Sequence, residues 1–481
     1  MPRNPVAEIT KILADITAKS QGLATRELSS PADMLVFERE VEGIKAELGE
    51  RVSASVIVAN VERLDQEKPR GHRHDGLTSM GMRSTTFRLL GGTKVKVTAR
   101  YCLPVHGKRR GRRRGVGRHG KWGRGSYPAL ARLGIQDGAT PALASEVAWH
   151  AAEAASMEVA QQALARRGVR MDRKAIRRLA YRYGQRSLRL RDARIQASGA
   201  SGGRDSAGPL AGKRVVVGVD GGRCRLRSGE TRGRRRAKTK RRGYRAPWRE
   251  PKVLTIYTID ERGRRDRREL PLHDGTMKDA DAVFALIVGH LRLLGAAEAA
   301  LLVLIGDGAR WIWDRIDKLI TAVGIPRERF VAIVDYYHAV EHLQKAADLR
   351  ESWSAPKRKD WMARNKKHLR AGRVETVIQA IDDLCVGRRA KAMRTERNYF
   401  ARNAERMRYR VFENRGLPIG SGAVESAVRR LVNLRIKSNA TYWLEQSAEA
   451  ILHLRAVLKA GRWEELERHA FDAAPSLMEA A

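Results

Sequence analysis

Cysteine is scarce in this chain of 481 residues: Cys102, Cys224 and Cys385 are the three present, and no two form a Cys-x-x-Cys pair. This excludes a disulfide framework and is typical of a reducing cytosol. No apolar run reaches the roughly 18 residues that are needed to cross a bilayer. The first residues, Met1-Pro-Arg-Asn-Pro, lack the apolar core of a signal peptide. We therefore expect a soluble cytoplasmic protein.

Acidic residues are few beside the basic ones. The chain has 95 Lys and Arg against 54 Asp and Glu, which gives a formal net charge of +41. An excess this large indicates a polyanionic partner, with nucleic acid first and a merely solvated basic surface as the alternative. No basic amphipathic helix with an aromatic face stands out, so a membrane surface is a poor candidate. Hydrophobic residues make up 42%, enough for real cores, and the length predicts about two to four domains.

Two stretches share one design, in which an apolar run leads into an aspartate and then a glycine. The first is Arg214-Val-Val-Val-Gly-Val-Asp220-Gly-Gly-Arg, and the second is Leu301-Leu-Val-Leu-Ile-Gly-Asp307-Gly-Ala-Arg. Apolar runs of this kind predict strands that are buried on both faces. A carboxylate at the end of such a strand is costly unless a cation meets it. An Asp-Gly pair after a strand can also be simply a turn.

The order of elements after residue 213 predicts the fold. A strand ends at Asp220, a second runs over Arg223-Cys-Arg-Leu-Arg, and a third covers 253–259. A helix over 279–294, a strand over 301–305, a helix over 311–323 and a strand over 330–335 follow. Three antiparallel strands and then helix, strand, helix, strand are the order of the ribonuclease H-like fold. We expect an α/β domain with a five-stranded mixed sheet, interrupted by an all-α insertion.

A third acidic residue, Glu425, lies in the first turn of a predicted helix that Ser421 can cap. Phosphoryl transfer on DNA needs two metal ions about 3.5–4 Å apart more than it needs covalent help. Magnesium takes oxygen ligands, and two Asp at strand ends with one Glu from a helix are the right types. The candidate metal ligands are therefore Asp220, Asp307 and Glu425. Alternatively, Glu425 pairs with Arg429 one helical turn later.

The region before residue 213 is predicted to be mainly helical. Apolar residues at three-to-four spacing predict helices over 4–66, which pack on the protein's own core or dimerise. Alternation on both sides of Gly91-Gly92 predicts a β-hairpin, followed by a Gly/Arg-rich basic arm for phosphate contact. Residues 140–184 are helical again, with Asp172 as an N-cap and a strongly basic helix after it. This arrangement resembles a helix-turn-helix and predicts DNA docking.

The predicted organisation therefore has seven parts. They are an N-terminal helical region (1–82), the β-hairpin and basic arm (83–138), a helix-turn-helix-like DNA-binding domain (139–196), a flexible linker (197–212), the first part of the catalytic domain (213–348), a helical insertion (349–415), and the second part of the catalytic domain with C-terminal helices (416–481).

Four motifs together resemble bacterial insertion-sequence DDE transposases, most closely the ISKra group and related mutator-like enzymes. They are Val219-Asp-Gly-Gly-Arg, Gly306-Asp-Gly-Ala-Arg-Trp-Ile, Asp335-Tyr-Tyr-His-Ala-Val-Glu-His and Ser421-Gly-Ala-Val-Glu-Ser. The resemblance covers roughly residues 80–465. Relatives often carry Cys-rich, zinc-binding spacing near the position of Cys102, and this chain departs from that pattern.

The resemblance implies that Asp220, Asp307 and Glu425 are the DDE triad, with Mg²⁺ as the cofactor and Mn²⁺ as a possible substitute. Asp335 and His338 match the C/D-x-x-H motif of these enzymes, so His338 is expected to act in catalysis near the metal or the scissile phosphate; a local hydrogen bond with Asp335 is the other interpretation. Family enzymes cut at terminal inverted repeats and join 3′-hydroxyl ends to target DNA. The implied partners are double-stranded transposon ends and target DNA, bound by a homodimer or higher oligomer at the bacterial nucleoid.

Further residues are expected to contact the nucleic acid. Trp311 and Trp313 are expected to be core residues; the alternative is that they form a stacking surface for an unpaired base. The expected contacts are Arg109, Arg110, Arg112, Arg113, Arg114, Arg173, Lys174, Arg177, Arg223, Arg310, Trp311, Arg435 and Lys437.

Two other functions would use some of the same residues. A ribonuclease H-like nuclease or junction resolvase would share the acidic residues but would not join strands. A non-catalytic DNA-binding protein would share only the basic surface, and the intact acidic residues count against it.

Overall fold

The computed structural model describes residues 4–67, 77–104, 125–200, 208–229, 231–232, 242–437 and 441–471. The chain divides into two compact units, Met1–Tyr183 with Glu464–Ala481, and Gly184–Trp463. The division falls within the long helix α6 (Arg173–Ala200), and not in the segment 197–212 that was expected to be a linker. None of the helices in the described part of the chain combines the length and the apolar character that crossing a membrane requires.

The first unit begins with two helices and a β-hairpin, as predicted. Helices α1 (Pro5–Ala24) and α2 (Pro31–Gln66) each carry Pro in the first turn and a capping side chain before it. Strands β1 (Leu77–Arg88) and β2 (Lys94–Pro104) pair antiparallel. The last turns of α2 pack on the hairpin through apolar side chains that include Val61, Phe87 and Val97. The last turns of α2, from Val58 onward, are thereby buried in the protein's own core.

The rest of the first unit is helical. Its elements are α3 (Pro128–Arg132), α4 (Pro141–Glu153), α5 (Met157–Arg166), the first part of α6, and most of α17 (Trp463–His469). Asp172 Oδ1 accepts the N–H groups of Lys174 at 2.9 Å and Ala175 at 3.0 Å, so the predicted N-cap of α6 is confirmed. Gly168, with φ of 84°, makes the turn between α5 and α6.

The second unit is an α/β structure around a five-stranded mixed sheet, which confirms the predicted class. The strand order is β11-β10-β3-β8-β9. Strand β8 runs antiparallel to its neighbours β3 and β9, whereas β10 and β11 are parallel to β3. The bounds are β3 (Arg214–Gly221), β8 (Lys252–Ile259), β9 (Leu272–Thr276), β10 (Leu301–Gly306) and β11 (Phe330–Val334).

The prediction for the second strand was wrong. The stretch after Arg223 forms β4 (Cys224–Arg225), which pairs with β7 (Trp248–Arg249) outside the main sheet. Further along, β5 (Thr231–Arg232) pairs with β6 (Gly243–Tyr244). The sheet strand that the prediction missed is β9, whose sequence Leu-His-Asp-Gly-Thr has a single β-branched residue and contains Asp and Gly, which are depleted in strands.

Strand β9 is held in place by a buried ionic cluster around Asp274, which is 1% exposed. The carboxylate lies 3.1 Å from Nη1 of Arg191, 2.8 Å from Nε2 of His290 and 3.4 Å from Nδ1 of His453. These partners come from α6, α7 (Ala280–Leu293) and α16 (Glu445–Lys459). Tertiary ion pairing therefore offsets the low strand propensity of this segment.

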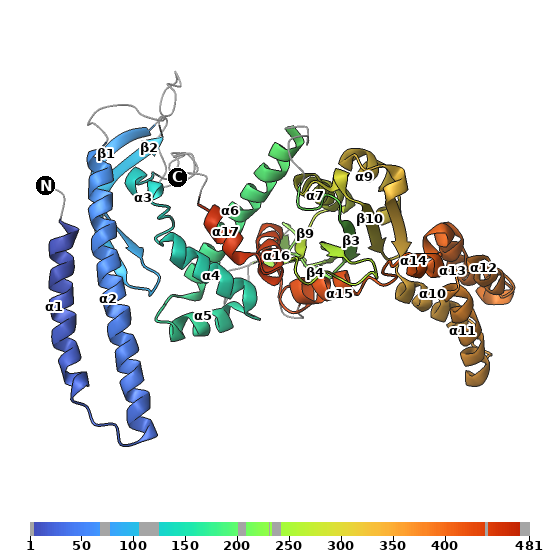
Figure 1. The fold of residues 1–481 in the computed structure, drawn as a ribbon, viewed down its shortest axis with the longest axis horizontal. Coiled ribbons are helices and arrows are strands. Elements are labelled where there is room, and N and C mark those ends of the chain that lie inside the picture. Colours follow the sequence, from blue (N-terminus) through green and yellow to red (C-terminus); the bar gives the residue numbers. More distant parts are fainter. Residues whose placement is uncertain are drawn as a thin grey trace. The chain divides into compact units, whose positions relative to one another are not determined.

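Helices cover both faces of the sheet (Figure 1). A Cβ atom built on Gly218 of β3 would touch Val424 of α15 (Gly422–Val428), and one on Gly275 of β9 would touch Leu452 of α16. Because residues in register share a face, α15 and α16 lie on the same side. The opposite face carries α7, α8 (Arg310–Trp313) and α9 (Ile316–Val323); the single helix expected over 311–323 is broken at Asp314-Arg315.

The segment 349–415 is helical throughout, as expected of the insertion. After α10 (Tyr336–Asp348) it contains α11 (Ala355–Arg370), α12 (Val374–Asp382), α13 (Ala390–Asn403) and α14 (Tyr409–Asn414), with short 3₁₀ turns at 387–389 and 404–407. Figure 1 shows these helices grouped at one end of the sheet. Buried side chains such as Met393 and Phe400 join them to the main core, so the insertion is part of the second unit.

The described parts of the segment 197–212 are ordered elements. Residues 197–200 belong to α6, and Leu210 is 7% exposed within the main core. Residues 201–207 lie outside the described part of the chain.

Candidate functional site

Three aspartates follow three neighbouring parallel strands. In the sheet register, Val219 is opposite Gly306, and Gly306 is opposite Val334. The next residue on each strand is therefore an aspartate: Asp220, Asp307 or Asp335. Because the carboxyl ends of parallel strands meet at one edge of a sheet, the three carboxylates converge there. The first two were predicted from sequence as metal ligands; the alignment of all three is a property of the sheet.

The glycine that interrupts the valine run explains how the helix of Glu425 reaches this edge. A Cβ atom on Gly218 would lie 2.9 Å from Cβ of Val424, so the missing side chain allows α15 to pack directly on β3. Side chains alternate along a strand, so Asp220 points to the same face as Gly218. That face is the one covered by α15, and Glu425 directly follows Val424 in this helix.

The two strand-end aspartates each use one carboxylate oxygen locally. Oδ1 of Asp220 accepts the N–H of Gly221 at 2.6 Å, and Oδ1 of Asp307 accepts the N–H of Ala309 at 2.9 Å. The turn expected after an Asp-Gly pair is thus present at Asp307. Among the described residues, none donates a hydrogen bond to Oδ2 of either aspartate. One oxygen of each carboxylate is therefore left for an external ligand.

Burial and the neighbouring acidic residues raise the pKa of Asp220 above its ordinary value. Burial raises this pKa to about 6, and the negative charges of Asp307 and Glu425 add to the effect. The N–H of Gly221 and the charge of His338 act in the opposite direction. A carboxylate in this position favours an arriving cation, since the cation would relieve both the burial cost and the repulsion.

Asp335 is fully buried and joins two segments of the chain. Its Oδ1 accepts the N–H of His338 at 2.8 Å, which caps α10, and its Oδ2 accepts the N–H of Ser421. Burial alone would raise the pKa of Asp335, but hydrogen bonds from His338 and Ser421 outweigh it and lower the pKa to about 2. Asp335 is thus an ionised anchor between β11 and the loop that leads into α15.

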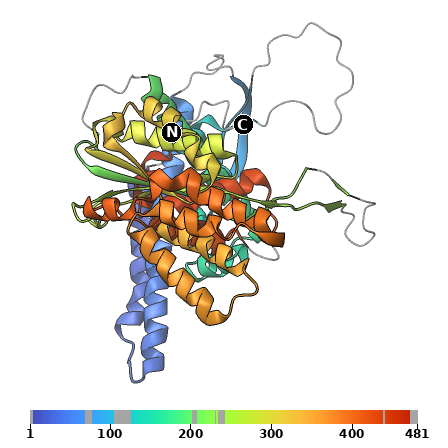
Figure 2. The same cartoon turned by 90° about the vertical axis from the view of Figure 1, so that its right-hand side faces the viewer.

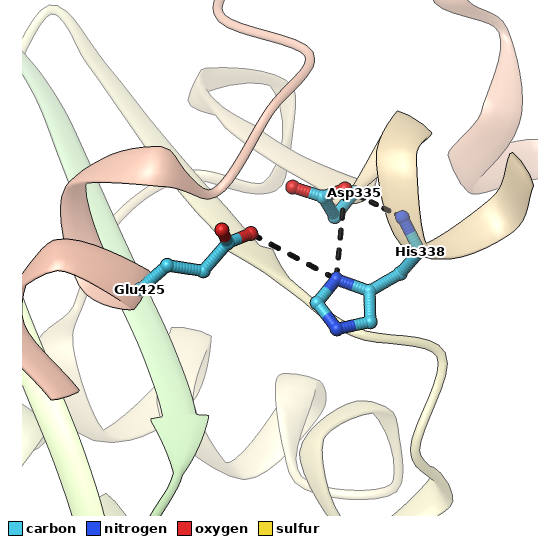
Figure 3. A group of neighbouring side chains, drawn as sticks. All are labelled: Asp335, His338 and Glu425. Carbon is cyan, nitrogen blue, oxygen red and sulfur yellow. Dashed lines mark hydrogen bonds and ion pairs between the residues drawn. The ribbon is translucent and has the colours of Figure 1, made fainter. Parts of the chain in front are cut away.

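His338 lies between two carboxylates (Figure 3). Its Nδ1 is 3.6 Å from Oδ1 of Asp335 and 4.0 Å from Oε1 of Glu425, both beyond hydrogen-bond distance. The local hydrogen bond to Asp335 comes instead from the backbone N–H of His338. The contact with Asp335 is the main reason that the pKa of His338 rises to about 9 despite burial, with smaller contributions from Glu341 and Asp307. The ring is therefore a cation at neutral pH.

Glu425 is oriented by its own helix. Oγ of Ser421 donates to Oε1 of Glu425 at 2.8 Å, and no side-chain cap of Ser421 on α15 is formed, contrary to the prediction. Within the described residues, Glu425 makes no ion pair with Arg429, so the alternative of a surface pair is not observed. The helix then passes into a π-helical turn at Arg429–Asn433. The Glu425 side chain remains 47% exposed beside the three aspartates.

No family model, curated protein or solved structure matches this chain.

Two sets of residues could hold a divalent cation. Asp335, His338 and Glu425 are the only described set of three whose potential ligand atoms all lie within 4.8 Å of one another. However, both oxygens of Asp335 already accept backbone N–H groups, and an imidazole nitrogen is not the oxygen ligand that Mg²⁺ prefers. Asp220, Asp307 and Glu425 instead offer only carboxylate oxygens, the ligands that Mg²⁺ prefers. The second set fits magnesium better, and His338 fits the role of a fixed cation at its side.

Sequence reasoning missed Tyr399, which reaches the site from the helical insertion. A Cβ atom on Gly308 would lie 2.0 Å from Cε2 of Tyr399, so the glycine after Asp307 is required by this close approach. His342 stacks on the Tyr399 ring at 3.6 Å between centroids. Burial, followed by the charges of Asp307 and Asp335, raises the pKa of Tyr399. Its position depends on α13, which is far from Asp307 in sequence, so no local pattern indicated it.

The residues predicted to bind nucleic acid lie in different environments. Arg173, Lys174 and Arg177 are exposed on α6, and Arg223, Arg310 and Lys437 are exposed in the second unit. Residues Arg109, Arg110, Arg112, Arg113 and Arg114 lie outside the described part of the chain.

Two of the predicted contact residues are packed against the protein itself. Trp311 is half-buried, with Lys252 Nζ 4.2 Å from its ring centroid and Phe284 at its edge. Arg435, which was predicted to contact nucleic acid, is 5% exposed and its guanidinium lies 5.1 Å from the ring centroid of Trp443. The contact with an aromatic ring allows this guanidinium to be buried.

Proposed function

We propose that this protein is a DNA transposase of the DDE type, which cleaves DNA strands and joins 3′-hydroxyl ends with Mg²⁺ or Mn²⁺. The observation that carries the proposal is the convergence of Asp220 and Asp307, at the ends of adjacent parallel strands, with Glu425 on the helix packed over them. Burial and the charges of Asp307 and Glu425 raise the pKa of Asp220, and a cation shared by the three carboxylates would relieve both effects. Phosphate chemistry is the reaction class that uses such a cation cluster.

The arrangement of the sheet supports a ribonuclease H-like fold for this domain. Only β8 is antiparallel to the other strands, and β3, the first strand of the domain, lies at the centre of the order β9-β8-β3-β10-β11. The acidic residues lie at the end of the central strand and at the end of its parallel neighbour. This places the proposed site at the carboxyl edge of the sheet, where open α/β sheets bind ligands.

When bound, divalent metal activates the attacking oxygen and neutralises charge on the leaving oxygen. The carboxylates of Asp220, Asp307 and Glu425 would hold it. His338 keeps a positive charge next to Glu425 at neutral pH and can attract the phosphate backbone. Asp335 acts indirectly, since its hydrogen bond to Ser421 fixes the start of the helix that carries Glu425.

Double-stranded transposon ends and target DNA are the proposed substrates, at the bacterial nucleoid. The formal charge of +41 and the exposed basic side chains at the start of α6 favour binding to the phosphate backbone. Cutting and joining at two ends favours a homodimer or higher oligomer on DNA. A nuclease without strand transfer remains the second candidate, because it would use the same carboxylates.

The test uses linear DNA that carries the sequences flanking the gene, a supercoiled plasmid and Mg²⁺. The full-length protein should nick the DNA at a repeat and join its 3′-hydroxyl end to the plasmid. Asp307→Asn should abolish both products and keep DNA affinity, whereas Asp314→Asn, an exposed acid nearby on the same segment, should leave both products unchanged.

Three outcomes would count against the proposal in different ways. Cleavage without joining would favour the nuclease. Equal losses from Asp307→Asn and Asp314→Asn would mean that Asp307 acts through general charge or folding. Products formed in the presence of a chelator would remove the metal from the mechanism.

A further inference from the structure

The strand that carries Asp220 continues beyond the sheet as part of a two-stranded arm, which is formed by β4 with β7 and by β5 with β6. The ladder of β3 and β8 ends at the pair Gly221–Lys252, and the pairs of β4 with β7 and of β5 with β6 extend the same hairpin outward. Figure 2 shows the arm as a narrow ribbon that leaves the body of the sheet. Arg223, the first arm residue with a long side chain, follows Asp220 by three residues, which is within about 10 Å along an extended strand.

The arm combines arginines with aromatic rings in a repeated pattern. The guanidinium carbons of Arg223 and Arg225 lie 5.3 Å and 5.0 Å from the ring centroid of Trp248. The guanidinium carbon of Arg227 lies 4.2 Å from the Tyr244 ring centroid. These contacts alternate along β4 and the residues after it, so the arginines share one face of the strand.

A third ring extends this face onto the neighbouring loop. Tyr442 lies 5.8 Å from Tyr244 in an edge-on arrangement, and the Arg225 guanidinium is 5.8 Å from the Tyr442 ring. The N–H of Arg227 donates to the carbonyl of Trp443 at 2.7 Å, which ties the arm to this loop. The arm is thus anchored at its base.

The aromatic residues of the arm are accessible. Trp248 is 38% exposed and Tyr244 is 39% exposed, although large aromatic side chains are usually buried. Arg223 and Arg227 are exposed beside them, as are Arg245 and Arg249 on the returning strand. The acidic residue at the base of the arm, Glu250, is paired with Lys252 at 2.8 Å. The arm is therefore a cationic surface with partly exposed aromatic rings.

We propose that this arm binds unpaired DNA that adjoins the phosphate held at the carboxylate site. Bases stack on accessible aromatic rings, and a single-stranded backbone needs cations at short intervals; the arm supplies both. A guanidinium beside a ring can still donate its N–H groups to phosphate oxygens. Intact duplex DNA would use the arginines but would offer no base face to Trp248 or Tyr244. The inference rests on the proposed function for the choice of DNA as the polymer.

The test measures equilibrium binding of a fluorescent oligodeoxythymidine of about 16 nucleotides, the upper end of the range for one such binding surface. Chelator is present, so no chemistry takes place. Trp248→Leu, which keeps apolar bulk but removes the ring face, should weaken binding about tenfold. Trp248→Phe should retain most of the affinity. Arg262→Ala removes one exposed arginine at the opposite end of β8 and should change affinity about twofold or less.

The location of the contact is measured separately, by photo-crosslinking an oligonucleotide that contains 5-bromodeoxyuridine. Crosslinked peptides should include Trp248 or Tyr244. The proposal is overturned if Trp248→Leu binds the single strand as tightly as the unchanged protein does. It is also overturned if Trp248→Leu weakens binding of a matched duplex as much as binding of the single strand, or if the unchanged protein binds oligouridine more tightly than oligodeoxythymidine. Binding by the arm without any metal-dependent strand cleavage would overturn the transposase proposal and leave the arm's role intact.

Discussion

The buried carboxylate of Asp335 accepts the backbone N–H of Ser421, a residue 86 positions further along the chain. The N–H of Tyr336 donates to the carbonyl of Ile419 at 2.8 Å, so two hydrogen bonds join the end of β11 to the loop before α15. Ser421 in turn donates to Glu425. The position of Glu425 in the candidate site is therefore determined by a residue on the far side of the helical insertion.

Asp335→Asn is expected to loosen the loop before α15. The substitution removes the charge and leaves one acceptor oxygen for the two N–H groups of His338 and Ser421, and a lost buried hydrogen bond costs about 1–3 kcal/mol. Amide hydrogen exchange of residues 417–428 should accelerate by about tenfold, and any metal-dependent activity should fall with it. Asp348→Asn, at the exposed end of the same helix, should leave exchange in this segment unchanged. Equal exchange in the two variants would remove Asp335 from the positioning of Glu425.

The charge of His338 predicts a pH dependence of stability. The contact with Asp335 raises the pKa of His338 to about 9, above the value near 6.5 of an unfolded histidine. A raised pKa means that the charged ring stabilises the fold fully below about pH 6.5, and that this contribution is lost as the pH rises through about 9.

His338→Gln should therefore flatten the stability profile between these pH values. We expect the unchanged protein to lose about 1–2 kcal/mol more than the variant over this range, because the ring is partly solvated. The measurement is denaturant unfolding at several pH values, together with the ring titration followed by NMR. If the His338 ring signal, identified by its absence in His338→Gln, titrates near pH 6.5, the ring is not held as a cation by Asp335.

Gly308→Ala should reveal the contact with Tyr399. The added methyl would lie 2.0 Å from Cε2 of the ring, so the ring or the Asp307 turn must move. We expect a stability loss of about 1–3 kcal/mol, as for other overpacked sites. In a Tyr399→Ala background the same substitution should cost far less, which a double-mutant cycle would measure. Gly229→Ala, where a Cβ atom meets nothing within 4 Å, is the matched control.

Asp274→Ala should destabilise the second unit strongly. It would remove the buried carboxylate partner of Arg191, which would keep the half-exposed Asp192, and breaking a buried pair costs about 3–5 kcal/mol. Asp317→Ala removes a carboxylate whose side chain is 98% exposed and should change stability by about 0.5 kcal/mol or less. Urea unfolding monitored by hydrogen exchange in β9 would compare the two. A small effect of Asp274→Ala would mean that β9 is held by packing alone.

Much of the candidate site was predictable because its strands are continuously apolar. Strands buried on both faces leave a strong local pattern, and the aspartates that end β3 and β10 stand out against it. The helix of Glu425 was also visible from its apolar spacing. Local sequence could not show that Gly218 brings this helix onto β3, since that contact joins residues about two hundred positions apart.

Other features depended on contacts between distant segments. Strand β9 has an unfavourable local sequence and is stabilised by the ionic cluster around Asp274. Arginine side chains usually lie on the surface, but Arg435 is buried against Trp443. Tyr399 belongs to the helical insertion, and only the packing of α13 brings it to Asp307-Gly308.

The sequence by itself determined the buried strands β3, β8, β10 and β11, the positions of the acidic residues and the strongly basic character of the chain. These properties follow from local patterns of apolar and charged residues, which need no long-range contact to be read. The tertiary structure decided which of those residues meet, because burial and ion pairing act between segments that the chain separates. It alone placed Asp335 as an anchor, Tyr399 at the site and the arginine–aromatic arm beside Asp220.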